Sequence, residues 1–224
     1  MSHQPKKRTL SCGYWLVLLT VALNSRASAS IVLEFRPPSQ TVLVGSTVNL
    51  GLYAVWDGQP HDSFAAVDAI VDWTPTYLKM LNVSNAGAVP LLSSGFPAND
   101  PYDLNEVVPP QDGDALYQAL ANFGSPVTAT SGGVLLTTLR FTALAQTPQT
   151  PVDFLLSGGS PVGYTRVYDG LMPNLDITGG LHGATVTIIP EPASGLLMLA
   201  ALVMLSRRAR QVQYVDGPSL LRSY

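Results

Sequence analysis

Short runs in which apolar and polar residues alternate are the feature that most constrains the fold of this chain. A period of two places the apolar side chains on one face of an extended strand and the polar ones on the other. Clusters rich in Gly, Pro, Asn and Asp separate the runs, as is typical of turns. We therefore predict an all-β, antiparallel two-sheet sandwich. The inward positions expected from this pattern are Val48, Leu50, Leu52 and Ala54, then Val67, Ala69, Val71 and Trp73, then Leu135, Thr137, Leu139, Phe141 and Ala143, and finally Val186 and Ile188.

One segment favours a short helix instead. Asp112 or Asp114 can cap its first turn, and Gly124 with Pro126 can end it. Between them lies an apolar stripe at helical spacing. We expect this helix to pack against the sandwich. The stripe consists of Ala115, Leu116, Ala119, Leu120 and Phe123.

The N-terminal segment has the three parts of a secretory signal peptide. Lys6, Lys7 and Arg8 precede an apolar core from Tyr14 to Leu23, and an Ala-x-Ala site ends at Ala27 and Ala29. This order predicts residues 1–29 to be removed after Ala29. An uncleaved membrane helix is the alternative, but an apolar core this short spans a bilayer poorly.

The C-terminal segment combines a helix breaker, an apolar run and a basic cluster. Pro190, Glu191 and Pro192 come directly before the uncharged stretch from Ala193 to Leu205. As a helix that stretch is about 20 Å long, against roughly 30 Å of hydrocarbon. It suits a transient membrane stop followed by processing, with a plain C-terminal anchor as the alternative. The basic residues that would stay on the cytoplasmic side are Arg207, Arg208 and Arg210.

This order of parts resembles the PEP-CTERM sorting signal of exopolysaccharide-producing Gram-negative bacteria. The resemblance implies a sorting signal and transmembrane segment over residues 190–210 that is recognised by an exosortase, a membrane-embedded cysteine protease or transpeptidase. It also implies an inner-membrane intermediate, followed by release to the cell surface or extracellular matrix. Such signals usually end soon after the arginines, whereas this chain continues through a tail over residues 211–224.

The segment between the two ends, residues 30–189, is acidic and contains no cysteine. It has four basic residues and thirteen acidic ones, a formal charge of −9, although the whole chain carries only −3. Such a charge repels nucleic acid and anionic lipid. The only cysteine, Cys12, lies in the signal peptide, so disulfides cannot stabilise the body. About 160 residues suffice for one domain with a core.

The body also resembles the cellulosomal cohesins. Ile31 to Phe35 and Thr41 to Leu50 are similar to the first strands of that family, and Ala66 to Leu78 to a strand, its turn and a following leucine. Leu136 to Ala145 resembles a later core strand. The resemblance implies a nine-stranded jelly-roll of the cohesin and carbohydrate-binding-module superfamily over residues 30–189.

Carboxylates and amides are densest between residues 99 and 114. Calcium takes six to eight oxygen ligands from such loops, although the spacing here fits neither an EF-hand nor a dockerin loop. We treat a calcium site as a hypothesis, with a solvated loop that ends in a helix cap as the alternative. The candidate ligands are Asp100, Asp103, Asn105, Asp112 and Asp114.

The sequence contains no recognisable catalytic constellation. His61 and His182 fall in expected loops, where we expect solvated imidazoles, and they have no zinc-ligand spacing. No nucleophile elbow is present. Asp68 and Asp72 lie four residues apart on one expected strand, so their side chains share a face at about 13 Å, which is too far apart for glycoside hydrolysis. We expect the protein not to be an enzyme.

Several aromatic residues are expected to face water and offer surfaces for sugar rings. Our leading hypothesis is an exported, non-enzymatic protein of the cell surface or extracellular matrix, sorted by an exosortase and associated with exopolysaccharide or biofilm. The alternative is a carbohydrate- or calcium-binding module whose partner is a polysaccharide or another surface protein. The aromatic candidates, some of which we expect to face water, are Tyr53, Trp56, Tyr102, Tyr117, Tyr164 and Tyr168.

Overall fold

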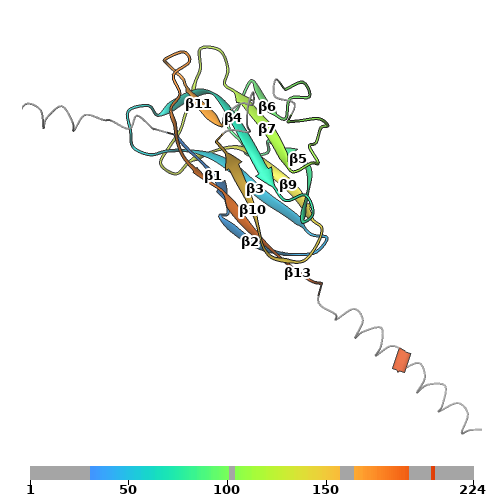
Figure 1. Cartoon of the computed structure of the whole chain (residues 1–224). Coiled ribbons are helices and arrows are strands. Elements are labelled where there is room, and N and C mark those ends of the chain that lie inside the picture. The colour runs from blue at the N-terminus through green and yellow to red at the C-terminus, as the bar shows by residue number, and fades with distance from the viewer. Residues whose placement is uncertain (1–30, 101–103, 157–163, 192–202, 205–224) are drawn as a thin grey trace, which may run out of the picture.

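Two β-sheets packed face to face form the body of the molecule (Figure 1). The computed structural model describes residues 31–100, 104–156, 164–191 and 203–204. The first sheet has the spatial order β12 (Thr178–His182), β1 (Ile31–Arg36), β3 (Thr47–Trp56), β9 (Val134–Ala143) and β5 (Leu78–Ser84). The second has the order β2 (Ser39–Leu43), β13 (Ala184–Ile189), β10 (Thr147–Leu155), β4 (Ser63–Trp73), β7 (Asp114–Leu120) and β6 (Ser93–Gly95), while β11 (Arg166–Asp169) and β8 (Val127–Thr128) also pair with β4.

The sandwich is mainly but not wholly antiparallel. β1 pairs with β12 in parallel, and β13 pairs with β2 in parallel. β1 and β2 are consecutive in the chain but belong to different sheets, so the chain crosses from one sheet to the other at Pro37 and Pro38. The described residues form thirteen strands rather than the nine of the expected jelly-roll, and the short strands include β6 at one edge and β8 and β11, which pair with β4.

The core lies between the two sheets and contains the inward positions expected from the alternation, with one shift. Val48, Leu50, Leu52 and Ala54 are fully buried, as are Val67, Ala69 and Val71. On β9 the pairing register shifts between Leu52 and Tyr53 of the opposing strand, so that Leu136 is skipped. This bulge buries Leu136 and leaves Leu135 half-buried, contrary to strict alternation.

The expected helix over residues 112–124 is wrong, because this segment forms strand β7. β7 pairs along its whole length with β4, from Asp114 opposite Asp72 to Leu120 opposite Ala66. Ala115, Tyr117 and Ala119 face the core, while Leu116 is buried on the opposite face. A strand that is apolar on both faces also produces an i, i+4 stripe, so the pattern alone could not separate the two structures. Pairing with β4 overrides the helical preference of its alanines.

The predicted signal peptide and the predicted C-terminal sorting signal lie mostly outside the described residues. The signal peptide with Ala27 and Ala29 lies outside them, as do the basic residues from Arg207 onward. β13 ends at Ile189, and the exposed Pro190 and Glu191 follow it directly. Within the described part of the chain, none of the helical residues belongs to a helix with the length and apolarity needed to cross a bilayer.

Candidate functional site

The outer face of the second sheet carries three rows of side chains that cross the strands. The registers between β10, β4 and β7 place Asp153, Asp72 and Asp114 side by side; we call this the acidic row. Two residues along each strand, Leu155, Ile70 and Leu116 form the apolar row. Two residues further, β11 replaces β10, and the polar row consists of Arg166, Asp68, Gln118 and Gly95.

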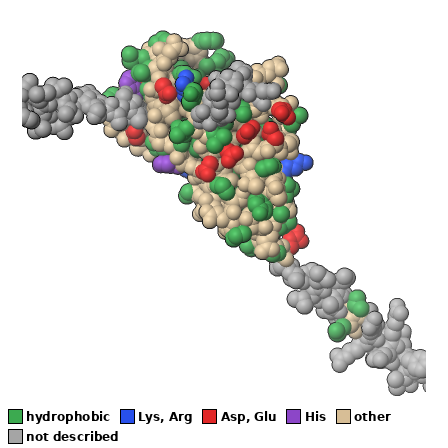
Figure 2. Space-filling model, in the orientation of Figure 1, with side chains coloured by type: hydrophobic (Ala, Val, Ile, Leu, Met, Phe, Trp, Pro, Cys, Tyr) green, Lys and Arg blue, Asp and Glu red, His purple; other side chains and the backbone are tan. Residues whose placement is uncertain are grey.

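The acidic row places like charges on adjacent strands. Burial raises the pKa of Asp72, and the neighbouring charge of Asp153 adds to that rise. The pKa of Asp114 is also raised, first by burial and then by Asp112, Asp72, Asp100 and Glu106. Figure 2 shows acidic side chains spread in a band across the middle of the visible face. Carboxylates placed directly opposite one another destabilise a sheet, so this row is kept at a cost in stability.

This arrangement predicts that Asp72→Asn stabilises the protein at neutral pH. An acid whose pKa is raised by folding binds more protons in the folded state, so its contribution to stability falls as the pH rises through that pKa. At pH 7 we expect the free energy of unfolding to increase by about 0.5 kcal/mol. Thermal melts from pH 3 to pH 8 test this. The gain must shrink below about pH 4, and a gain that is independent of pH would contradict the assigned cause.

A loop between β6 and β7 covers the apolar row. Leu104 packs on Ile70 and Leu116. The side-chain amide of Asn105, which is only 2% exposed, forms hydrogen bonds with the backbone of β7 as a neighbouring strand would. Its Nδ2 donates to the carbonyl of Leu116 at 2.9 Å, and its Oδ1 accepts the N–H of Leu116 at 3.0 Å. Asn105 thereby closes the edge of β7 beside β6.

The calcium hypothesis receives no geometric support from the residues that the structure describes. Asp100 accepts the N–H groups of Leu104 and Asn105 at 3.1 and 2.7 Å, and the Asn105 amide is used on Leu116. No group of three His, Cys, Asp or Glu side chains among the described residues is placed to hold a metal ion. Asp103 lies outside the described residues.

The polar row is a chain of hydrogen bonds centred on Asp68. Gln118 Nε2 donates to Asp68 Oδ1 at 2.9 Å. Burial raises the pKa of Asp68, and hydrogen bonds from Gln118 and Tyr168 together with the charge of Arg166 oppose that rise. The expectation that Asp68 and Asp72 share one face is confirmed, with Ile70 between them.

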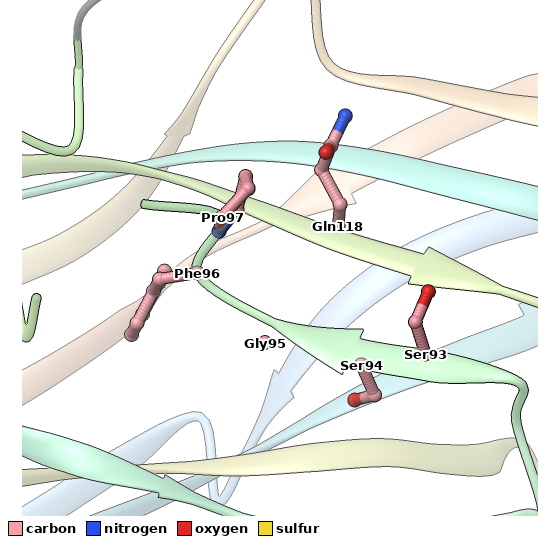
Figure 3. Close-up of a pocket in the computed structure, with 6 residues that line it drawn as sticks. All are labelled: Ser93, Ser94, Gly95, Phe96, Pro97 and Gln118. Atoms are coloured by element: carbon pink, nitrogen blue, oxygen red, sulfur yellow. The ribbon is translucent and has the colours of Figure 1, made fainter. Parts of the chain in front are cut away.

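A small hollow adjoins this row at the edge of the sheet (Figure 3). Its volume is about 220 Å³, and Ser93, Ser94, Gly95, Phe96, Pro97 and Gln118 line it. The side chains of Ser93, Pro97 and Gln118 stand on the open side of β6, whereas Ser94 and Phe96 point to the other side. Ser94 and Phe96 both contact Tyr117 in the core, through a hydroxyl pair at 2.7 Å and an edge-on ring contact. Contacts with the buried Tyr117 therefore fix the segment that forms the wall of the hollow.

His182 keeps 65% of its side chain exposed, as expected of a solvated imidazole, whereas His61 is partly buried and paired with a carboxylate. His61 Nδ1 lies 2.5 Å from Oδ2 of Asp169, whose side chain is 1% exposed. Asp169 also accepts the N–H groups of Leu171 and Met172. Burial raises the pKa of Asp169, but these two backbone donors and His61 outweigh burial and lower it overall.

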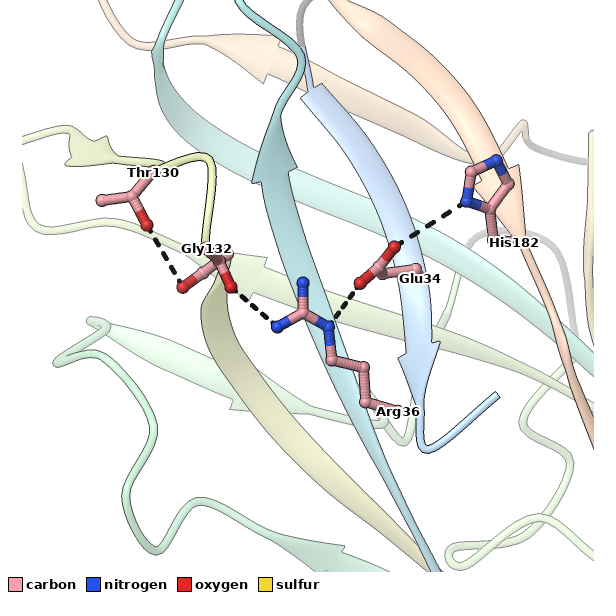
Figure 4. A network of polar contacts seen from close by, with 6 residues as sticks. Glu34, Arg36, Thr130, Gly132 and His182 are labelled. Atoms are coloured by element: carbon pink, nitrogen blue, oxygen red, sulfur yellow. Dashed lines mark hydrogen bonds and ion pairs between the residues drawn. The ribbon is translucent and has the colours of Figure 1, made fainter. Parts of the chain in front are cut away.

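His182 belongs to strand β12 rather than to a loop, and it joins a polar network on the outer face of the first sheet (Figure 4). Its Nδ1 lies 3.8 Å from Glu34, which also pairs with Arg36. Arg36 donates to the carbonyl of Gly132 at 2.7 Å and covers the ring of Tyr53. This network ties two strands to the turn before β9. Glu34, Arg36 and His182 do not combine a nucleophile with a general base.

The aromatic residues do not form one exposed row. Tyr117 is fully buried and is therefore not one of the aromatic residues that face water, and burial raises its pKa. Trp56 donates its indole N–H to the carbonyl of Gln59 at 2.6 Å. Tyr164 is 50% exposed and lies against Arg166, while Tyr168 stands beside Asp68. Tyr102 lies outside the described residues.

Comparison with known proteins shows the fold and no more. A chain of a type I cohesin–dockerin complex from Clostridium thermocellum matches with a TM-score of 0.51 and 14% identity, covering 71% of this chain and 99% of that one. The seventh ScaB type I cohesin from Pseudobacteroides cellulosolvens gives 0.50 and 14%, covering 72% and 92%. The cohesin module of a Clostridium perfringens family 33 glycoside hydrolase gives 0.50 and 10%, covering 73% and 99%.

The fold is that of a cohesin module. No protein-family model matches the chain, and no curated protein matches it. The structural matches confirm, at the level of fold, the cohesin-like sandwich expected from the strand patterns. The strand over Ala66 to Trp73 and the turn that follows it are also present as expected.

Sequence reasoning missed the rows on the outer face of this cohesin-like sandwich. Asp68, Asp72 and Asp114 were visible as polar positions, but their alignment depends on the pairing of β10, β4 and β7. The hollow beside Gln118 was missed as well. One local signal was present there, the Ser-Ser-Gly-Phe-Pro run over residues 93–97, which is too polar and too broken for a core strand.

Proposed function

We propose that this chain is an exported, non-enzymatic module that binds a protein partner at the cell surface or in the extracellular matrix. The observation that carries the proposal is the cohesin-like sandwich with the acidic row on its outer face. One structure of similar fold was solved as a cohesin–dockerin complex, and a partner protein is the corresponding expectation for this chain.

The chemistry of the acidic row defines the partner. Asp72 and Asp114 are adjacent across two strands. Burial is the main reason that both pKa values are raised, and neighbouring carboxylates add to the rise, Asp153 for Asp72 and Asp112 with Asp72 for Asp114. A basic surface placed over them would relieve this repulsion and speed the encounter by electrostatic attraction. We therefore expect a partner that presents Lys and Arg side chains.

The two terminal segments supply the route to the cell surface. The signal peptide over residues 1–29 directs export, and Pro190, Glu191 and Pro192 with the following apolar and basic segments serve as the substrate of an exosortase. Exposure of Pro190 and Glu191 beyond the last strand supports access by a processing enzyme. The acidic body suits a matrix rich in exopolysaccharide, where it remains soluble.

Site-directed cross-linking tests the binding face. A photoreactive residue at Asp153, which is exposed beside Asp72, should capture one defined protein on the surface of the producing cell. The same group at Asn49, exposed on the outer face of the first sheet, should not. We expect the Asp72→Lys and Asp114→Lys double variant to reduce capture at least tenfold. Equal capture from both faces, or capture that is insensitive to the double variant, would refute the assignment.

A further inference from the structure

The hollow beside Gln118 has the size and lining of a binding site for one small, neutral, hydrogen-bonding ring. Its volume of about 220 Å³ is below the range of roughly 300–1,000 Å³ that is usual for drug-sized ligands. Ser93 supplies a hydroxyl, Gln118 a carboxamide and Pro97 an apolar surface, and all three stand on the open side.

Gly95 creates the space. Side chains alternate along β6 and the residues after it, so that the outward positions are Ser93, Gly95 and Pro97. A Cβ atom at Gly95 would have no neighbour within 4 Å, which shows that the space above this residue is open. Its φ of 154° also favours glycine. A side chain here would stand in the hollow.

Among the residues that the structure describes, no charged side chain lines the hollow, and the charges around it select against anionic ligands. Asp68 is held by Gln118 and Tyr168 and faces Arg166, so its negative charge is compensated within the row. An anionic ligand would meet this carboxylate and the charge of −9 on the body. Gln118 uses one amide hydrogen on Asp68, and a primary amide has a second N–H and an oxygen to offer. This N–H donor and oxygen acceptor of Gln118 can together bind two adjacent hydroxyl groups of a ligand.

The polar row extends the hollow across the sheet. From β6 to β11 the row crosses three strand spacings, about 14 Å. At its far end Tyr168 and the half-exposed Tyr164 offer aromatic surface beside Arg166. An oligosaccharide lying across the strands would meet hydrogen-bonding groups at one end and rings at the other.

We infer that the hollow formed by Ser93, Gly95, Pro97 and Gln118 binds one residue of a neutral glycan, and that the polar row through Asp68 to Tyr168 receives the next residues. This site is separate from the acidic row, because the apolar row and Leu104 lie between them. The sandwich thus carries two surfaces, one for a basic protein and one for a neutral sugar chain.

Affinity electrophoresis of the full chain in mild detergent tests this inference. The probes are the exopolysaccharide of the producing cell, dextran, galactomannan and xyloglucan, each cast into a separate gel. We expect at least one of them to retard the protein. Gln118→Ala should weaken that retardation at least tenfold, because it removes the carboxamide.

Ser93→Trp is the second variant and fills the hollow from an exposed position, so it preserves the fold. It should also abolish retardation. Gln149→Ala, at an exposed position on β10, and Asp72→Asn in the acidic row should bind like the original protein. If none of the four polysaccharides retards the chain, or if Ser93→Trp is retarded normally, the inference is wrong. Loss of glycan binding in Asp72→Asn would also overturn it.

Discussion

Asn105→Ala is expected to lower the free energy of unfolding by about 3 kcal/mol. The substitution leaves the N–H and C=O of Leu116 and the carbonyl of Pro97 without their partner in a site that is 2% exposed. Each buried, unsatisfied polar group costs about 1–3 kcal/mol. In a chain of this length, about 3 kcal/mol corresponds to a fall in Tm of roughly 6–12 °C.

Chemical denaturation of the Asn105→Ala variant measures this loss. Asn49→Ala is the matched control, because Asn49 is exposed on β3, and it should change the stability by less than about 0.5 kcal/mol. Repeating both in calcium and in chelator separates two roles for Asn105. A structural residue gives the same loss in both, whereas a loss seen only with calcium would restore the ligand assignment made from sequence.

Glu191→Ala is expected to stop C-terminal processing almost completely. Glu191 is exposed one residue beyond the last strand, with a proline on either side in the sequence, so its carboxylate is accessible to a processing enzyme. In a host with an exosortase, we expect the mature protein to start near Ser30 and to lack the segment after the tripeptide. The variant should instead accumulate in the inner membrane with Tyr224 present.

Mass spectrometry of both ends of the protein, after cell fractionation, provides the readout. Glu106→Ala, another exposed glutamate, should be processed normally. A host without the exosortase should reproduce the phenotype of Glu191→Ala. Normal processing of the variant, or an intact chain of 224 residues in the cytosol, would refute the sorting proposal.

Strand positions that face the opposite sheet were predicted well. Val48, Leu50, Leu52 and Ala54 are buried there, as are Val67, Ala69, Val71 and Trp73. Apolar positions on the outer face were not. Ile70 and Leu116 are buried there by Leu104, a contact between segments that no local pattern records, and the second apolar face of β7 led to its prediction as a helix.

The candidate site was predicted only in part, for a related reason. Asp68 and Asp72 were correctly placed on one face, because both lie on a single strand and the period of a strand is fixed. His61 was expected to be solvated, since its partner Asp169 lies more than a hundred residues away in the chain. Asn105 was grouped with calcium ligands, whereas its amide replaces a backbone partner of β7.

By itself the sequence determined the all-β class, the inward residues of the regular strands, and the acidic, cysteine-free character of the body. These follow from periodicity and composition, which act along the chain. The tertiary structure alone decided the order of the strands, the bulge at Leu136, and the three rows on the outer face. Rows across a sheet depend on the register between strands that are distant in sequence, and that register is fixed only when the two sheets pack together.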